Sequence, residues 1–335
     1  MQLIVRAGAG YDTIDAVHCA KKGIYVANCP GKNAHAVAEL ALGLILNIDR
    51  RMAEGVQLLK EGQWNKPLFA NCKGLKGRTL GLIGFGNIAQ LVHQRAQAFE
   101  MNTLVHTRTQ VPSLQKKLGF EYASLDELLA RCDVVSLHVP STADTKGFVN
   151  KEFLSKMRED AVLINTARGN VIVDDDLLAH LDSHPNFWYG ADTYNNEPAA
   201  KGPFDSPLAK HPRVYGTHHI GASTKQAEAA IGDEAVRIIK KFAKSGQVDA
   251  ENCVNKETDS SKLKKISVRH YDRVGVLAHV FLVMSQFNFN VQELENVVFK
   301  EREACVANIQ FSGEGDMQKL VEEINKNENV LDVLV

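Results

Sequence analysis

The feature that most constrains the fold is an alternation of short apolar runs with helical periods between about residues 79 and 217. The predicted strands cover residues 79–84, 103–107, 134–139, 161–165, 188–192 and 213–216, and helices at 87–99, 124–131 and 174–181 separate some of them. Strands that alternate with helices indicate βαβ units. The sequence therefore predicts an α/β fold built on a parallel sheet.

A glycine-rich turn lies where the first of these strands meets the first helix. Gly84-Phe85-Gly86-Asn87-Ile88-Ala89 reads G-x-G-x-x-A, a pattern that binds the pyrophosphate of a dinucleotide in this strand–turn–helix context. Gly84 permits the tight turn, Gly86 lets the backbone approach the pyrophosphate, and the helix N-terminus offers free N–H groups. We predict a Rossmann-type doubly wound parallel sheet; the alternative is that the glycines serve packing alone.

The residues after the second strand bear on the choice of nucleotide. A carboxylate there would hold the 2′-hydroxyl of NAD, but this chain has Thr107 and Arg108. Because a guanidinium can pair bidentately with a phosphate, the sequence permits NADP(H). The alternative is that Arg108 is a solvated loop cation.

The segments outside this region indicate further domains. Residues 34–48 form a long, largely apolar helix that we expect at a domain interface. Residues 256–263 are polar and aperiodic, as in a linker, and after them the elements follow the ferredoxin-like order βαββαβ. The predicted division is a substrate-binding domain (1–74 with 218–255), a dinucleotide-binding domain (75–217), the linker, and a C-terminal α+β domain (264–335).

Charge and composition exclude several classes of function. With 39 Lys and Arg against 40 Asp and Glu, the chain has no basic field for nucleic acid or an anionic membrane. We also expect no membrane-spanning helix, because no apolar run reaches about 18 residues. The six cysteines form no C-x-x-C pair and the twelve histidines no zinc-binding spacing. We therefore expect reduced thiols, no metal site and a cytoplasmic location.

Three polar side chains stand at predicted strand ends or in the loops that follow. Arg168 lies in NTARG at 165–169, Glu197 in NNEP at 195–198, and His219 in HHIGAS at 218–223. Hydride transfer to a 2-oxo acid needs a cation for the carboxylate, a proton donor for the forming alkoxide, and a carboxylate that orients this donor. Each residue alone has a structural alternative. Behind a dinucleotide motif, the three together favour catalysis at the carboxyl ends of the strands.

These motifs, with GFGNIA at 84–89, resemble those of the D-isomer-specific 2-hydroxyacid dehydrogenases, and the resemblance covers residues 3–255. The C-terminal domain is similar to an ACT domain. The chain therefore looks most like the branch of this family that acts on 3-phospho-D-glycerate. This implies hydride transfer between 3-phospho-D-glycerate and NAD(P), the first step of serine biosynthesis, with NAD(H) as the family's cofactor.

The resemblance also implies roles by position. Arg168 would hold the substrate carboxylate and carbonyl oxygen, His219 would be the general acid or base, and Glu197 would orient His219. With Thr107 and Arg108, the expected cofactor contacts are Gly84, Gly86, Asn87, Ile88, Val139, Pro140, Thr145, Thr166, Ala167, Asp192, Gly221 and Ala222. The expected substrate contacts are Arg6, Ala7, Gly8 and Asn33. Arg6 is a candidate partner of the 3-phosphate or, alternatively, part of a structural ion pair. One departure is His218, which stands where the family usually has proline.

ACT domains bind small amino acids between paired modules. By resemblance, His270, Asp272 and Asn290 are candidate contacts for serine. Asp272 stands where serine-regulated members have asparagine, and Val274 replaces a usual proline. The alternative is an assembly module that joins sheets edge to edge across subunits. We expect a homodimer or homotetramer.

Three other interpretations stay open. The chain could be a glyoxylate or hydroxypyruvate reductase that uses NADP(H), a nucleotide-sensing binding protein of the same fold, or a form inactivated by truncation. Met1 falls in the middle of the flavodoxin-like substrate domain of the family. We therefore expect an N-terminally truncated chain whose partial substrate domain has an exposed sheet edge.

Overall fold

The computed structural model describes residues 1–257 and 261–335, whose contacts divide the chain into two units, 1–256 and 257–335. Within the predicted linker 256–263, residues 258–260 lie outside the described residues. No helix in the described ranges is both long and apolar enough to cross a membrane.

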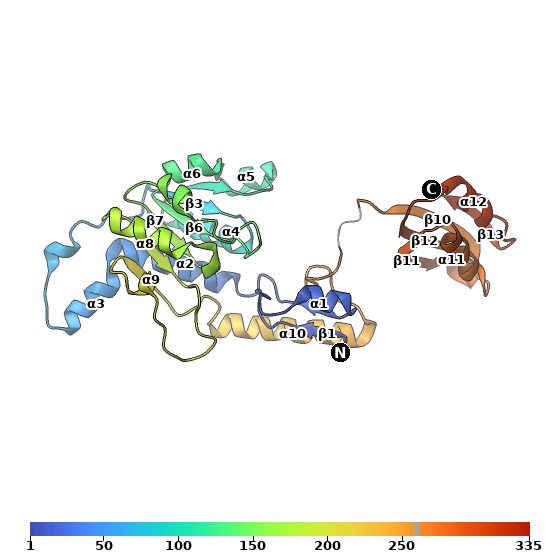
Figure 1. The fold of residues 1–335 in the computed structure, drawn as a ribbon, viewed down its shortest axis with the longest axis horizontal. Helices are drawn as coiled ribbons and strands as arrows, with labels where there is room; N and C mark the ends of the chain where they lie inside the picture. Colours follow the sequence, from blue (N-terminus) through green and yellow to red (C-terminus); the bar gives the residue numbers. More distant parts are fainter. Residues whose placement is uncertain (258–260) are drawn as a thin grey trace. The chain divides into compact units, whose positions relative to one another are not determined.

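A seven-stranded sheet forms the centre of the first unit (Figure 1), and each neighbouring pair of strands is parallel. The order is β5-β4-β3-β6-β7-β8-β9, so the chain reverses direction across the sheet between β3 and β6. Dinucleotides bind at such a reversal point. The predicted doubly wound sheet is thus confirmed. Its strands are β3 (Thr79–Ile83), β4 (Asn102–His106), β5 (Glu121–Tyr122), β6 (Val134–Leu137), β7 (Val162–Asn165), β8 (Trp188–Ala191) and β9 (Val214–Gly216).

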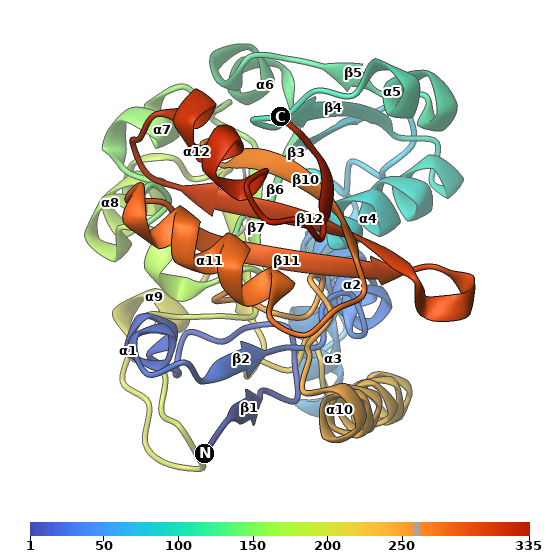
Figure 2. The ribbon, with the colours of Figure 1, turned by 90° about the vertical axis from the view of Figure 1, so that its right-hand side faces the viewer.

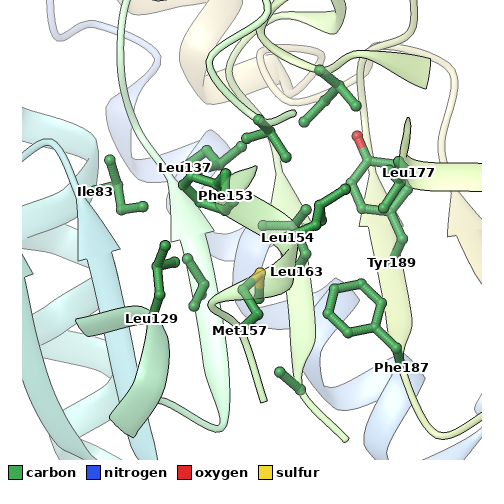
Figure 3. Packing of buried hydrophobic residues seen from close by; sticks show 14 of the residues in the cluster. Ile83, Leu129, Leu137, Phe153, Leu154, Met157, Leu163, Leu177, Phe187 and Tyr189 are labelled. Carbon is green, nitrogen blue, oxygen red and sulfur yellow. The ribbon is translucent and has the colours of Figure 1, made fainter. Parts of the chain in front are cut away.

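Helices cover both faces of this sheet, which is why its central strands are continuous apolar runs. All four residues of β6 and all four of β7 are buried. One face packs on α6 (Leu125–Arg131), α7 (Lys151–Ser155), α8 (Asp174–Ser183) and α9 (Pro207–Lys210). Figure 3 shows this layer, in which Phe153 and Leu154 of α7 lie near Leu163 of β7. The other face packs on α2 (Ala34–Arg50) and α4 (Asn87–Ala98), with α5 (Pro112–Leu118) at its margin. Helix α3 (Met52–Lys60) follows α2 and has no buried residue.

The substrate side of the first unit contains a much smaller sheet. Strands β1 (Leu3–Val5) and β2 (Tyr25–Ala27) pair in parallel, with α1 (Ala16–Lys21) between them in sequence. The long helix α10 (Lys225–Ser245) runs beside β1 (Figure 1) and buries Ile238 against Ala27 and Cys29. Residues far apart in sequence therefore build this side, whereas α2, which also falls within the predicted segment 1–74, packs on the large sheet. The boundaries of a separate substrate-binding domain stay a prediction, since the contacts join residues 1–256 in one unit.

The second unit has the predicted βαββαβ order, with an antiparallel sheet in the order β11-β12-β10-β13. Figure 2 shows both of its helices beside this sheet, and their apolar side chains join the sheet in one core. Its elements are β10 (Lys264–Tyr271), α11 (Val276–Gln286), β11 (Asn290–Val298), β12 (Ala304–Ser312), α12 (Met317–Ile324) and β13 (Val330–Leu334). The predicted ferredoxin-like domain is confirmed.

Candidate active site

Three neighbouring strands deliver the three predicted catalytic residues to one edge of the large sheet. Arg168 follows β7, Glu197 follows β8 and His219 follows β9. Because the strands are parallel, their carboxyl ends meet at the same edge. The structure brings two of the three into direct contact, since His219 Nδ1 pairs with Glu197 Oε1. Both side chains are partly exposed, so a substrate can reach the imidazole.

The loop that carries His219 is organised by a buried carboxylate. Asp192 is 1% exposed and follows β8. Its Oδ1 accepts from Thr217 Oγ1 (2.5 Å) and the Ile220 N–H (2.8 Å), and its Oδ2 accepts from the Gly221 N–H (2.8 Å). His219 has φ 54°, a left-handed conformation that is costly for a residue with a side chain. Three charge-assisted hydrogen bonds on both sides of His219 offset that cost.

The loop that carries Arg168 is organised by an amide. Asn165 is fully buried at the end of β7; its Nδ2 donates to the Arg168 carbonyl (2.9 Å) and its Oδ1 accepts from the Ala167 N–H (3.0 Å). The Arg168 guanidinium then reaches the N-terminal segment. Its Nε donates to Asp12 Oδ2 at 2.9 Å, and its Nη1 donates to the Ala167 carbonyl at 2.7 Å.

The loop that carries Glu197 is held from the side of α8. Asn195 Nδ2 donates to Asp174 Oδ1 at 2.8 Å and, at 3.3 Å, to the Ile172 carbonyl. Burial raises the pKa of Asp174, and the bond from Asn195 partly counters this effect. Asn196, with φ 56°, makes the turn that brings Glu197 back toward β9.

The glycine turn fits a dinucleotide pyrophosphate. Gly84 has φ 84°, and a Cβ there would lie 2.4 Å from the His138 carbonyl oxygen, so only glycine fits. At Gly86 a Cβ would meet nothing within 4 Å, which leaves room in front of the turn. Gly86 is also the N-cap of α4 and has no side chain to accept the first N–H groups, so Asn87 and Ile88 begin a helix whose N-terminus faces this room.

One predicted cofactor contact, Thr166, and one predicted substrate contact, Asn33, each have a buried oxygen without a partner among the described residues. These atoms are Thr166 Oγ1 and Asn33 Oδ1. Buried polar atoms are rarely left unpaired, so both are suited to a ligand with amide and hydroxyl groups. Ala167 follows Thr166 in the loop after β7, whereas Gly221 and Ala222 lie in the loop after β9.

Other expected cofactor contacts have different surroundings. Thr145 Oγ1 donates to the Pro140 carbonyl at 2.6 Å and accepts from the Thr142 N–H at 2.8 Å, so this hydroxyl closes the loop after Val139. Thr107 and Arg108 follow β4; Arg108 is exposed and, within residues 1–257 and 261–335, has neither an ion pair nor a hydrogen bond. Desolvation lowers the pKa of His138, next to Val139, to about 4.

The predicted substrate loop belongs to the N-terminal segment, whose Asp12 meets Arg168. Gly8 is buried with φ 147°, and its carbonyl accepts from the Cys29 N–H at 3.0 Å. Arg6 is exposed and donates to the Ala7 carbonyl. A Cβ on Gly8 would lie 3.0 Å from Arg6 Nη1, so the guanidinium lies over this loop. No ion pair involves Arg6 in the part of the chain that the structure describes.

The structure does not bring the three candidate effector contacts together within one chain. His270 is 2% exposed, and its Nε2 lies 3.3 Å from Asn296 Oδ1, so its imidazole belongs to the interior of the domain. Asp272 follows the end of β10 that pairs with Ala304, whereas Asn290 pairs with Ser312 at the other end of β12. Eight residues of strand separate them by about 26 Å. Within one chain, Asp272 and Asn290 therefore do not share a site.

Comparison with known proteins agrees with this fold and site. Residues 42–221 match the family model for the NAD binding domain of D-isomer specific 2-hydroxyacid dehydrogenases, and residues 266–332 match the AHAS small subunit-like ACT domain. A hydroxypyruvate reductase of Thermotoga maritima is 41% identical over 72% of this chain and 77% of its own length. A D-3-phosphoglycerate dehydrogenase of Methanocaldococcus jannaschii is 36% identical over 76% of this chain, but over only 48% of its own length.

A solved structure is similar as well. The D-lactate dehydrogenase of Aquifex aeolicus, complexed with NAD and lactic acid, superposes with a TM-score of 0.70 at 32% identity, over 77% of this chain and 81% of its own. The fold and the site define an NAD-dependent oxidoreductase that acts on CH–OH groups. The chain belongs to the D-isomer-specific 2-hydroxyacid dehydrogenases, and it carries a C-terminal ACT domain.

Sequence reasoning missed the residues that shape the catalytic loops. Asp12 was not singled out, because an acidic residue in a loop gives no signal of the arginine that it meets 156 positions later. Asn165 is visible in the sequence only as part of the NTARG motif. The place of Asn165 as the last residue of a buried strand is a usable signal, since a buried amide must bond to the loop that follows.

Proposed function

We propose that this chain oxidises a D-2-hydroxy acid and reduces the matching 2-oxo acid. The single observation that carries this proposal is the His219–Glu197 pair at the same sheet edge as the glycine turn and Arg168. Bound NAD would accept or return the hydride. Arg168 holds the substrate carboxylate beside the reacting carbon. His219 Nε2 gives its proton to the carbonyl oxygen in reduction and takes it from the hydroxyl in oxidation. Glu197 keeps Nδ1 protonated, so that Nε2 faces the substrate.

For the substrate we propose 3-phospho-D-glycerate, with 3-phosphohydroxypyruvate as product. Arg6 supports this choice, because it is a guanidinium without an ion pair in residues 1–257 and 261–335 and lies over the substrate loop. A guanidinium in this place can pair bidentately with a phosphate. The C-terminal ACT domain is in keeping with an enzyme at the entry to an amino-acid pathway.

A second candidate is reduction of hydroxypyruvate or glyoxylate. Two similar proteins favour this candidate. One is the hydroxypyruvate reductase already described, and the other is a glyoxylate reductase of Thermococcus litoralis, which is 35% identical over 78% of this chain. Arg108 after β4, which has no ion pair with any residue that the structure describes, also suits the 2′-phosphate of NADP(H), so we propose that NADP(H) is accepted beside NAD(H).

One set of assays tests both proposals. The purified chain is measured with 3-phosphoglycerate, D-glycerate, hydroxypyruvate and glyoxylate, each with the NAD and the NADP form of the cofactor. We expect the highest kcat/KM with 3-phosphoglycerate, and Arg6→Met to lower it about 10- to 100-fold, as expected for loss of a charge-assisted contact, with little change for glycerate. The exposed Arg50→Met is the matched control. An equal effect of Arg6→Met on glycerate contradicts the phosphate contact, and a strong NAD preference excludes NADP(H).

We further propose that the ACT domain binds a small amino acid, with serine as the first candidate. Asp272 and Asn290 are both exposed, and paired copies of the domain could bring them together. Titration of the activity with serine tests this proposal. We expect inhibition that Asp272→Ala weakens, whereas no inhibition at millimolar serine removes serine as the effector.

A further inference from the structure

Tyr194 lies against two glycines, Gly169 and Gly216, and leaves no room for a side chain at either position. A Cβ on Gly169 would lie 2.1 Å from the carbonyl carbon of Tyr194 and 2.5 Å from the Asn195 nitrogen. A Cβ on Gly216 would lie 1.6 Å from the Tyr194 hydroxyl oxygen and 2.9 Å from Cζ. The backbone of Tyr194 thus fills the space at one glycine, and its hydroxyl fills the space at the other.

These contacts join the three loops of the candidate site. Gly169 directly follows Arg168, Tyr194 comes three residues before Glu197, and Gly216 comes three residues before His219. The Tyr194 N–H also donates to Glu197 Oε2 at 3.4 Å. The ring packs edge-on against Phe204, with ring centroids 5.4 Å apart, so the side chain is held from behind.

We infer that Tyr194 is a positioning residue that fixes the loops of Arg168, Glu197 and His219 relative to one another. The inference rests on the proposed roles of these three residues. Tyr194 acts through volume, because its hydroxyl occupies the place that a methyl group at position 216 would take. Burial, together with the charge of Asp192, raises the pKa of Tyr194 to about 12, so the hydroxyl stays neutral throughout the assay range.

A double-mutant cycle tests the contact between Tyr194 and Gly216. Gly216→Ala alone forces the methyl group and the hydroxyl into one place, so we expect kcat to fall about 100-fold, as for a displacement of about 1 Å at a reacting group. Tyr194→Phe alone leaves a gap, and we expect kcat to fall about tenfold with cofactor affinity unchanged. In Tyr194→Phe/Gly216→Ala the methyl group takes the place of the hydroxyl after a shift of the ring, so we expect higher activity than in Gly216→Ala.

The controls separate positioning from general stability. Gly43→Ala is the matched control, because a Cβ at Gly43 in α2 would meet nothing within 4 Å. We expect Tyr194→Phe to lower kcat while its Tm stays near that of the wild type; a lower Tm with unchanged kcat overturns the inference in favour of a purely structural role. If Gly216→Ala does not fold, an active double variant supports the inference and an unfolded one overturns it.

The variant His219→Ala separates failure of the inference about Tyr194 from failure of the proposed function. Wild-type activity in His219→Ala would refute the catalytic assignment, whatever the cycle shows. An inactive His219→Ala together with additive effects in the cycle would leave the function standing and overturn the role of Tyr194.

Discussion

The two sides of the candidate site are built by different means, although both belong to the first unit. The catalytic side stands on seven strands, and its loops are held by the buried Asn165 and Asp192 and by glycines that admit no methyl group. The substrate side stands on two strands, and much of what holds it is ionic. An example is Glu234 of α10, which pairs with both Lys32 and Arg237.

This difference indicates that the catalytic loops are rigid and that the substrate side can adjust its position. Close packing and buried hydrogen bonds allow few arrangements, so the backbone of the loops that carry Arg168, Glu197 and His219 is set mainly by the catalytic side, while the Arg168 guanidinium also bonds to Asp12 of the substrate side. The ion pairs of the substrate side have at least one partly exposed partner, Lys32, Arg237 or Asp12, so water and salt weaken them. Changes on the catalytic side are therefore expected to act mainly on kcat, and changes on the substrate side on KM, pH dependence and salt dependence.

The largest expected effect is that of His219→Ala. Loss of a positioned acid–base group lowers kcat by roughly 10²–10⁴-fold, while the affinity for the cofactor stays near the wild-type value because the glycine turn is untouched. Steady-state kinetics and a cofactor titration measure the two effects. The adjacent, exposed His218→Ala is the matched control and should retain most activity. If the two variants lose activity equally, the assignment of the proton donor to His219 is wrong.

A smaller effect, on stability, is expected from Glu234→Gln. The Glu234 carboxylate is nearly buried and bonds to Arg237, Asn252 and Lys32. The hydrogen bonds from Arg237 are the main reason that the pKa of Glu234 falls from 4.5 to about 2. Since the folded state lowers this pKa, the stabilisation is fully present above about pH 4.5 and is lost as the pH falls toward 2.

We therefore expect Glu234→Gln to destabilise the chain by about 1–3 kcal/mol near neutral pH and by progressively less below pH 4.5. Thermal unfolding followed by circular dichroism from pH 3 to pH 7 measures this. Glu228→Gln, an exposed position in the same helix, is the control. A Tm difference that stays constant over this range would contradict an ionic role for Glu234.

The sequence predicts the strands of the catalytic side better than it predicts the contacts made by the substrate side. Buried strands such as β6 and β7 have a continuous apolar pattern, so the sheet and its order of elements could be predicted from residues alone. The two-residue strand β5 could not, because it is too short to have a period. Motifs placed Arg168, Glu197 and His219 at one sheet edge.

Contacts between distant segments were out of reach. The pairing of Asp12 with Arg168 depends on how the N-terminal segment packs against the loop after β7, and no local sequence pattern predicts that packing. The separation of Asp272 from Asn290 depends on strand register in an antiparallel sheet. The contact of Tyr194 with Gly216 depends on volumes of a few cubic ångströms, and a sequence motif does not express these.

The smallest expected effect is that of Asp12→Asn, where the two sides meet. Asp12 is half exposed and bonds to Arg168 Nε at 2.9 Å. Exposed pairs contribute about 0.2–1 kcal/mol, so we expect KM for the 2-oxo acid to rise about two- to fivefold with kcat nearly unchanged. The effect should shrink as salt is added, because salt screens exposed charges. Asp233→Asn, an exposed change on α10, is the control. A lower KM would show instead that Asp12 competes with the substrate carboxylate for Arg168. A loss of kcat would show that the substrate side helps to set the reacting geometry, against the division of roles drawn from the structure.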